Sequence, residues 1–396
     1  MKPTRFTYNH TIVASYFGYI TQSIINNLAP LLFLIFQDTF AISVTQITML
    51  ITINFGVQIA VDYFSARFVD KIGYRISIVS AHIFAAAGLV GLAVLPTLLP
   101  HPYVGLLIAV VLYAIGGGII ETLISPIVEA CPTDNKASVM SLLHSFYCWG
   151  TVAVIVLSTL FLFAFGKGSW PILPCLWAIL PLCNAFVFSR VPIATLTEGD
   201  EGMTLRELCG KKMFWLFILL MIASGASEQA MSQWASAFAE KGLNVSKTVG
   251  DLTGPCMFSI LMGCSRVFYA KYSEKVNLVS FIIGSGILCV GSYLLAAFAP
   301  TPILSLAGCA LCGLSVGILW PGVFSIASAY FPKGGTAMFA ILALAGDLGC
   351  GGGPTVVGTV ADAFGEDLKP GLVAALIFPI VLIICSLIYK KARKAK

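Results

Sequence analysis

Runs of mostly apolar residues, each about 20 residues long, recur along the whole chain. A helix needs about 20 such residues to cross a hydrocarbon core roughly 30 Å thick, so each run predicts a transmembrane helix. The composition agrees, because 58% of the residues are hydrophobic and only 10% are charged, unlike a soluble domain. The sequence therefore predicts an all-α membrane protein with twelve transmembrane helices. The predicted spans are residues 11–35, 45–66, 76–97, 103–129, 138–163, 171–189, 213–238, 249–270, 278–299, 302–328, 337–361 and 370–389.

One longer polar segment interrupts this pattern. Residues 189–212, SRVPIATLTEGDEGMTLRELCGKK, carry acidic and basic side chains between the sixth and seventh predicted spans. This segment reads as a linker between two halves. We therefore predict a six-helix bundle in residues 1–189, a cytoplasmic linker in residues 190–212 and a second six-helix bundle in residues 213–396.

The two predicted bundles resemble each other in sequence. The segment ARFVDKIGY after the second span aligns with AKYSEKVNL after the eighth, at an offset of 204 residues. The segment GGIIETLISPIVEACP aligns with GILWPGVFSIASAYFP at an offset of 200 residues. A repeat in the same orientation predicts two pseudo-symmetric halves, with a substrate site between them near the middle of the bilayer.

The lysines and arginines are divided unequally between the two sides of the membrane. With the N-terminus inside, 18 of them fall on the inner side and 4 on the outer side, while Arg266 lies within a span. Positive charge resists translocation, so we predict a multi-pass protein of the plasma membrane with both termini cytoplasmic. The net charge of +5 follows from this bias and does not indicate nucleic-acid binding. The first apolar run is too long for the core of a cleavable signal peptide.

The sequence carries no motif for catalysis or for a cofactor. It contains no phosphate-binding loop, nucleophile elbow or zinc signature. Its 12 cysteines are scattered through the predicted helices, and Cys309 and Cys312 form a CxxC inside a span. There the spacing places two small residues on one helix face, and we do not expect it to bind metal. We therefore expect no enzyme, no cofactor and no metal site.

The segment ARFVDKIGYRIS resembles the loop motif between helices two and three of the major facilitator superfamily, G-x-x-x-D-R/K-x-G-R/K-R/K. Asp70, Lys71, Gly73 and Arg75 match that motif, whereas Tyr74 replaces the basic residue directly after its second glycine and Ala66 replaces its first glycine. The resemblance implies two six-helix bundles and transport by alternating access.

Four further segments resemble the fucose:proton symporter group of this superfamily. They are ETLISPIVEACP, SLLHSFYCWG, ILWPGVFSIA and GCGGGPTVVGTVAD. The chain departs from the group where Ala29 and Pro30 follow Asn26 and Asn27, a place where the group often has an aspartate, and where His144 replaces a glutamine. The resemblance implies proton-coupled transport of a sugar, and the departures argue against fucose itself.

Ionisable side chains inside the predicted spans are the candidate functional residues. A charge at the centre of the bilayer costs about 2.5–3.5 kcal/mol on insertion scales, so such a residue usually faces a bundle interior or a watery cavity. Glu121 is predicted to bind substrate or carry a proton, the alternative being a hydrogen-bonded acid that links helices. His144 is predicted to bind a hydroxyl or accept the proton, the alternative being a packing histidine.

Amide and aromatic side chains extend the predicted substrate site. Amides bind hydroxyls and an aromatic ring stacks on the apolar face of a sugar, although packing explains the tryptophan equally well. Further ionisable residues are assigned to coupling and gating. The predicted substrate-binding residues are Asn26, Asn27, Glu121, His144, Glu228, Gln229, Gln233 and Trp234. The predicted proton-coupling residues are Glu121, His144, Glu228 and Asp347. The predicted gating residues are Asp62, Asp70, Arg75 and Arg266, of which Asp62 and Arg266 are read as inner-gate or snorkelling charges.

Three functions fit these observations. The first is proton-coupled transport of a small polar solute, most readily a sugar, by a monomer in a lipid bilayer. The second is proton-coupled efflux of amphipathic drugs or metabolites, which would use an aromatic cavity and acidic residues. The third is a receptor or scaffold that kept the fold without transport, because fold does not determine function.

Overall fold

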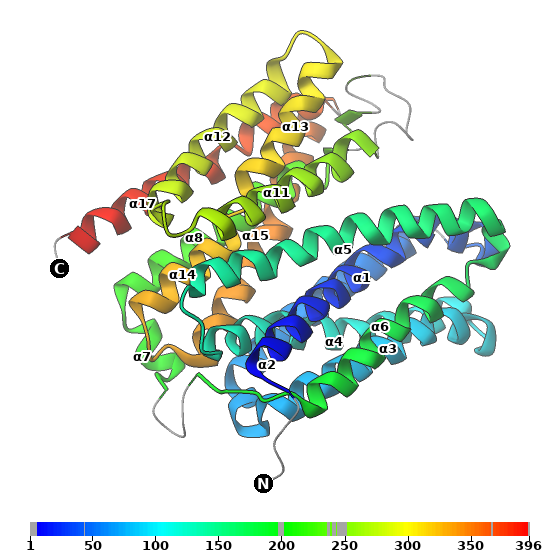
Figure 1. The fold of residues 1–396 in the computed structure, drawn as a ribbon. Helices are drawn as coiled ribbons and strands as arrows, with labels where there is room; N and C mark the ends of the chain where they lie inside the picture. The colour runs from blue at the N-terminus through cyan, green and yellow to red at the C-terminus, as the bar shows by residue number, and fades with distance from the viewer. Residues whose placement is uncertain are drawn as a thin grey trace. The chain divides into compact units, whose positions relative to one another are not determined.

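The computed structural model describes residues 6–42, 44–196, 202–235, 238–239, 243, 252–365 and 367–394. Every regular element in these ranges is a helix (Figure 1). Nine helical stretches of the described chain are long and apolar enough to cross a membrane. The prediction of an all-α membrane architecture is therefore confirmed.

Six long helices precede the linker in the described chain. Their apolar sequences bury small residues against neighbouring helices, as membrane helices do where backbones approach closely. A Cβ on Gly118 of the fourth helix would lie 2.8 Å from Cβ of Val61 on the second, for example. The helices are α1 (Tyr8–Phe40), α2 (Val44–Ile72), α3 (Tyr74–Leu98), α4 (Pro102–Ala130), α5 (Lys136–Phe165) and α6 (Ile172–Arg190), with a short 3-10 turn η1 (Lys167–Ser169) before α6.

Gly73 alone connects α2 to α3. Its φ angle is +94°, in a region that residues with a Cβ seldom adopt. The glycine of the loop motif therefore permits a turn of one residue between two long helices.

The linker contains one short helix, α7 (Leu205–Cys209). Thr204 caps it, because its hydroxyl accepts from the backbone N–H of Glu207 while its own backbone N–H donates to the Glu207 carboxylate at 2.8 Å. These bonds to Thr204 lower the pKa of the exposed Glu207 side chain. The backbone N–H of Met203 also donates to the carbonyl of Lys333 at 2.8 Å, which ties the start of this segment to a loop of the second half.

The second half is more interrupted than the sequence predicts. The span predicted at residues 302–328 is two helices, and the span predicted at 370–389 is also two. Proline explains both breaks: Pro321 and Pro379 lack the N–H that would bond to the carbonyl four residues earlier. The elements are α8 (Lys212–Ser232), η4 (Leu252–Cys256), α11 (Met257–Tyr272), α12 (Leu278–Phe298), α13 (Pro302–Val316), α14 (Leu319–Tyr330), α15 (Gly335–Ala363), α16 (Leu368–Ala374) and α17 (Ile377–Lys394).

The chain packs into two compact units. Unit 1 consists of Met1–Thr133, Trp149–Gly202 and Gly335–Ala340, and unit 2 consists of Asp134–Cys148, Met203–Gly334 and Ile341–Lys396. The single helix α5 thus contributes its first residues to unit 2 and the remainder to unit 1. In unit 2, a Cβ on Gly349 of α15 would overlap the carbonyl of Ile222 on α8, so a glycine is needed for these two helices to touch.

Candidate functional site

Unit 1 contains a network of amides around Glu121. Gln22 on α1 donates through Nε2 to Oε2 of Glu121 at 2.9 Å and to Oε1 of Gln58 at 3.0 Å. Gln58 on α2 in turn donates to Oδ1 of Asn26 at 3.0 Å, and Asn54 lies within 3.4 Å of the same oxygen. Residues predicted separately on the first and fourth helices are therefore joined by amides of α1 and α2.

Exposure differs within this network. Gln22 and Gln58 are 1% exposed, whereas Asn26 and Glu121 are partly exposed. The buried amides therefore hold the polar side chains that remain accessible. Gln22 Oε1 and Asn54 Oδ1 have no hydrogen-bond partner among the described residues, which leaves two acceptors of the network unused.

Asn27 joins a second group of hydroxyls in the same unit. Its amide donates to the carbonyl of Ser23 at 2.9 Å and lies 3.4 Å from Oγ1 of Thr151 on α5. The hydroxyls of Ser23 and Thr151 are themselves 2.9 Å apart. Asn27 is partly exposed, like Asn26.

The sequence analysis missed Gln22, Asn54, Gln58 and Thr151. One signal for Gln22 was available, because it lies four residues before Asn26 and therefore on the same face of α1. Glycines make room for the network, since a Cβ on Gly117 would lie 3.0 Å from Oε1 of Gln22. The GGG segment before Glu121 thus brings α4 close to α1 and α2.

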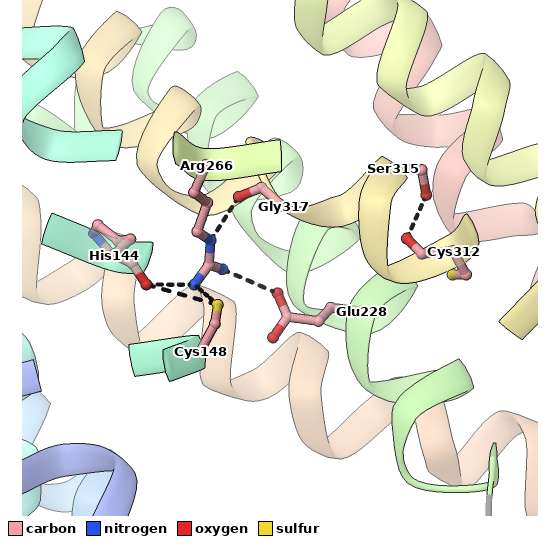
Figure 2. Close-up of polar contacts among 7 residues, drawn as sticks. All are labelled: His144, Cys148, Glu228, Arg266, Cys312, Ser315 and Gly317. Carbon is pink, nitrogen blue, oxygen red and sulfur yellow. Dashed lines mark hydrogen bonds and ion pairs between the residues drawn. The ribbon is translucent and has the colours of Figure 1, made fainter. Parts of the chain in front are cut away.

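Unit 2 contains a second cluster, centred on Arg266 of α11 (Figure 2). Its Nε donates to the carbonyl of Gly317 at 2.7 Å, and Nη1 donates to the carbonyl of His144 at 2.7 Å. The Sγ of Cys148 lies 3.0 Å from Nη1. Nη2 faces the Glu228 carboxylate of α8 at 3.7 Å, an ion pair without a hydrogen bond.

The Gly317 carbonyl is available because of Pro321. In a continuous helix it would accept from the N–H of residue 321, which a proline lacks. The freed carbonyl lies in the break between α13 and α14, where Arg266 takes it. Interrupted helices of this kind often surround binding sites in transporters.

Arg266 is 3% exposed and Glu228 is 6% exposed. The snorkelling interpretation of Arg266 is therefore wrong, because its guanidinium is directed into unit 2 and bonded there. His144 contributes its backbone carbonyl to this cluster, while its ring lies 5.8 Å from the Phe324 ring. Asp347 is also buried in unit 2, on α15 next to the glycines that pack against α8.

The remaining predicted substrate residues lie at the end of α8. Trp234 donates through Nε1 to the carbonyl of Pro354 at 3.0 Å, and a Cβ on Gly358 would lie 2.9 Å from its ring. These contacts favour packing against α15 as the role of Trp234. Gln233 is exposed, and its amide lies 3.4 Å from Oε1 of the partly exposed Gln229.

The loop-motif residues make structural contacts within unit 1. Asp70 accepts a hydrogen bond from the hydroxyl of Thr336 at 2.8 Å, and Thr336 also contacts the hydroxyl of Tyr74. Arg75 donates to the carbonyls of Phe188 and Val191, both at 2.9 Å, which joins α3 to the end of α6. Asp62, the other predicted gating residue, is fully buried on α2.

Apolar helices of membrane length indicate a multi-pass membrane protein, and broken helices beside buried polar clusters are typical of transporters. The sequence profile described as Major Facilitator Superfamily matches residues 12–354. The chain belongs to this superfamily. It is therefore a membrane transporter of small molecules and not an enzyme.

Two curated proteins are similar to this chain. The membrane protein MosC of Rhizobium meliloti is 26% identical over 330 residues, which cover 83% of this chain and 76% of that protein. The gentisate transporter of Corynebacterium glutamicum is 25% identical over 159 residues, which cover 38% of this chain and 34% of that protein.

Solved structures of symporters share the fold. The transporter FucP in its outward conformation has a TM-score of 0.82 at 15% identity, over 96% of this chain and 99% of that one. The proton:xylose symporter XylE, bound to 6-bromo-6-deoxy-D-glucose, has a TM-score of 0.84 at 13% identity, over 97% and 95% of the two chains. At these identities the likeness shows the fold alone.

Proposed function

We propose that this transporter moves a small, hydroxyl-rich solute such as a sugar, coupled to protons by alternating access. The observation that carries the proposal is the unit 1 network, in which buried Gln22 and Gln58 hold the partly exposed Asn26 and Glu121. Amides both donate and accept hydrogen bonds, as hydroxyl groups also do, so they suit a polyol. The names of two fold relatives, a fucose:proton symporter and a proton:xylose symporter, support the same cargo.

Glu121 is the proposed proton carrier. As a carboxylate it accepts the 2.9 Å bond from Gln22, and as a neutral acid it needs an acceptor for its new O–H. Rotation of the Gln22 amide presents Oε1 to that O–H, and the Gln58 and Asn26 amides rotate with it, because Oε1 of Gln22 would otherwise face Oε1 of Gln58. The network is thus able to accommodate both protonation states of Glu121. Glu228 and Asp347 are the next candidates, as buried acids of unit 2.

The proposed topology follows the charge asymmetry of the sequence. Both termini and the linker at residues 190–212 are cytoplasmic, the bundles are residues 1–189 and 213–396, and the protein is a monomer in the plasma membrane. His144, Gln229 and Gln233 remain proposed substrate contacts, and Asp62, Asp70, Arg75 and Arg266 remain proposed gating residues.

Uptake by proteoliposomes tests the function. Labelled xylose, fucose, galactose and inositol are supplied with and without an inside-alkaline pH gradient. We expect at least one of them to accumulate, and the accumulation to collapse when a protonophore removes the gradient. Entry only to equilibrium in both conditions would refute the coupling, and failure of every compound to enter or to bind would refute the hydroxyl-rich cargo.

A further inference from the structure

A groove of about 660 Å³ runs along one side of unit 2, between α11, α12 and α13. It is lined by small residues on two helices and by larger apolar residues around them. The groove has room because some of its lining residues are small: Cys264, Ser280 and Gly284. Its walls are formed by larger apolar residues: Phe268, Phe281 and Leu288. A Cβ on Gly284 would meet no atom within 4 Å, so the groove is open at its floor.

The groove opens toward the surroundings of the helices and not toward their shared interior. Phe268 is 48% exposed and Leu288 is 39% exposed, and Ile287 beside the groove is 60% exposed. In a chain that spans the membrane, large exposed apolar side chains on these helices face hydrocarbon. A molecule in the groove is therefore reached from the lipid phase.

One end of the groove is basic. Lys390 of α17 donates through Nζ to the hydroxyl of Ser280 at 3.1 Å, in the first turn of α12. Lys271 lies near the end of α11, with its Nζ 5.6 Å from the centre of the Tyr272 ring. Lys390 thus contacts a lining residue of the groove at the start of α12, and Lys271 adds a second positive charge at the end of α11.

The chemistry changes along the groove. Beyond Ser280 lie the hydroxyl side chains of Ser265 and Ser285, which are 3% and 7% exposed. Leu288 and Leu314 follow at the apolar end. From Ser280 to Leu288 the distance along α12 is about 12 Å at 1.5 Å per residue. The order along the groove is therefore cation, then hydroxyl, then apolar wall.

A phospholipid carries phosphate, ester oxygens and acyl chain in that same order. We propose that the groove binds one anionic phospholipid, with its phosphate at Lys390 and Ser280, its ester oxygens at Ser285 and an acyl chain along Leu288 and Leu314. The lysines supply the positive charge that binds an anionic headgroup. The Ser285 hydroxyl supplies a hydrogen-bond donor for an ester oxygen, which a hydrocarbon chain alone could not accept. This site is separate from the amide network of unit 1 and does not depend on the transported solute.

The test uses the purified, delipidated full-length protein in detergent. Native mass spectrometry counts bound lipid, and thermal unfolding measures stabilisation, with added dioleoylphosphatidylglycerol, dioleoylphosphatidylcholine or glycerol 3-phosphate. We expect phosphatidylglycerol to bind one to one and to raise the unfolding temperature by several degrees. Phosphatidylcholine should bind at least fivefold more weakly, and glycerol 3-phosphate should not stabilise the protein.

Two matched pairs of variants locate the site. Gly284→Leu fills the groove, whereas Gly291→Leu places the same side chain on α12 outside it, where a Cβ also meets no atom within 4 Å. Gly284→Leu should abolish lipid binding and Gly291→Leu should not. Lys390→Gln should weaken phosphatidylglycerol about tenfold and phosphatidylcholine, which carries the same phosphate but no net charge, by less, while Lys391→Gln should have little effect.

Several outcomes would overturn the proposal. Equal binding of the two phospholipids would refute recognition of the headgroup charge. Unchanged lipid binding to Gly284→Leu would refute the groove as the binding site. Stabilisation by glycerol 3-phosphate alone would assign the basic end to a soluble phosphate. If Gly284→Leu does not fold, the pair Lys390→Gln and Lys391→Gln still tests the proposal. Equal effects of these two variants on lipid binding would refute a specific headgroup site.

Discussion

The Arg266 guanidinium and the Glu228 carboxylate lie 3.7 Å apart, and both side chains are almost completely buried. The distance is too long for a hydrogen bond, so the pair relies on charge alone at this contact. Arg266 is held instead by the carbonyls of Gly317 and His144, each at 2.7 Å. Backbone carbonyls orient the guanidinium but do not neutralise it, so Glu228 remains its only ionic partner in the described chain.

Removing that partner is expected to destabilise the protein. Breaking a buried pair by changing one member typically costs about 3–5 kcal/mol, because a charge is left uncompensated. Glu228→Gln should therefore lower the unfolding temperature in detergent clearly, while Glu207→Gln on the exposed linker helix should leave it nearly unchanged. The double variant Glu228→Gln/Arg266→Gln should lose less than the sum of the two single changes. Additive losses would show that the two side chains act independently.

The Pro321 contact yields a second prediction. Pro321→Ala supplies an N–H that competes with Arg266 for the Gly317 carbonyl and favours a continuous helix through the break. The measurement is the unfolding temperature of protein purified from identical membranes. Pro321→Ala should change this temperature more when Arg266 is present than in an Arg266→Gln background. The same change in both backgrounds would mean that the carbonyl and the arginine are not coupled.

Glu121→Gln is expected to separate binding from coupling. Glutamine mimics the neutral acid and still accepts from Gln22, so substrate exchange in proteoliposomes should persist while accumulation driven by a pH gradient disappears. Glu207→Gln serves as the control. A Glu121→Gln protein that still concentrates substrate would transfer the coupling role to Glu228 or Asp347.

Gly349 provides a test of helix packing in unit 2. Its Cβ would overlap the Ile222 carbonyl, whereas a Cβ on Gly351 of the same helix would meet no atom within 4 Å. Alanine improves helix propensity equally at both positions, by about 1 kcal/mol, so the difference isolates the contact. Gly349→Ala should lower the unfolding temperature and Gly351→Ala should keep or raise it. Equal shifts would show that α8 and α15 tolerate separation at this point.

The proposed orientation can be tested by cysteine labelling. In a background without other cysteines, Cys209 in α7 and a Lys391→Cys variant should react with an impermeant maleimide only from the cytoplasmic side. A Lys167→Cys variant in η1 should react only from the outside, because five membrane-spanning helices separate it from the cytoplasmic N-terminus. Labelling of Cys209 and Lys391→Cys from opposite sides would contradict the two-bundle topology.

Hydropathy predicted the helices well because crossing a membrane requires long apolar runs. It could not predict the break between α13 and α14, since a window of 20 residues averages over Pro321. Pairing was harder still. Arg266 and Glu228 lie on different helices, and only helix packing brings them together. The amides around Glu121 were partly visible, as Asn26 and Asn27 were predicted, but Gln58 required knowing that α2 lies against α4.

The one-residue connection at Gly73 also affects how the protein enters the membrane. Only one residue lies between Ile72 and Tyr74. No loop between α2 and α3 is therefore long enough to let α2 enter the membrane while α3 stays outside it. We therefore expect them to insert together during synthesis, as a helical hairpin. A longer residue at position 73 would strain that turn, and its defect would appear first as poor insertion and early degradation, before any effect on transport.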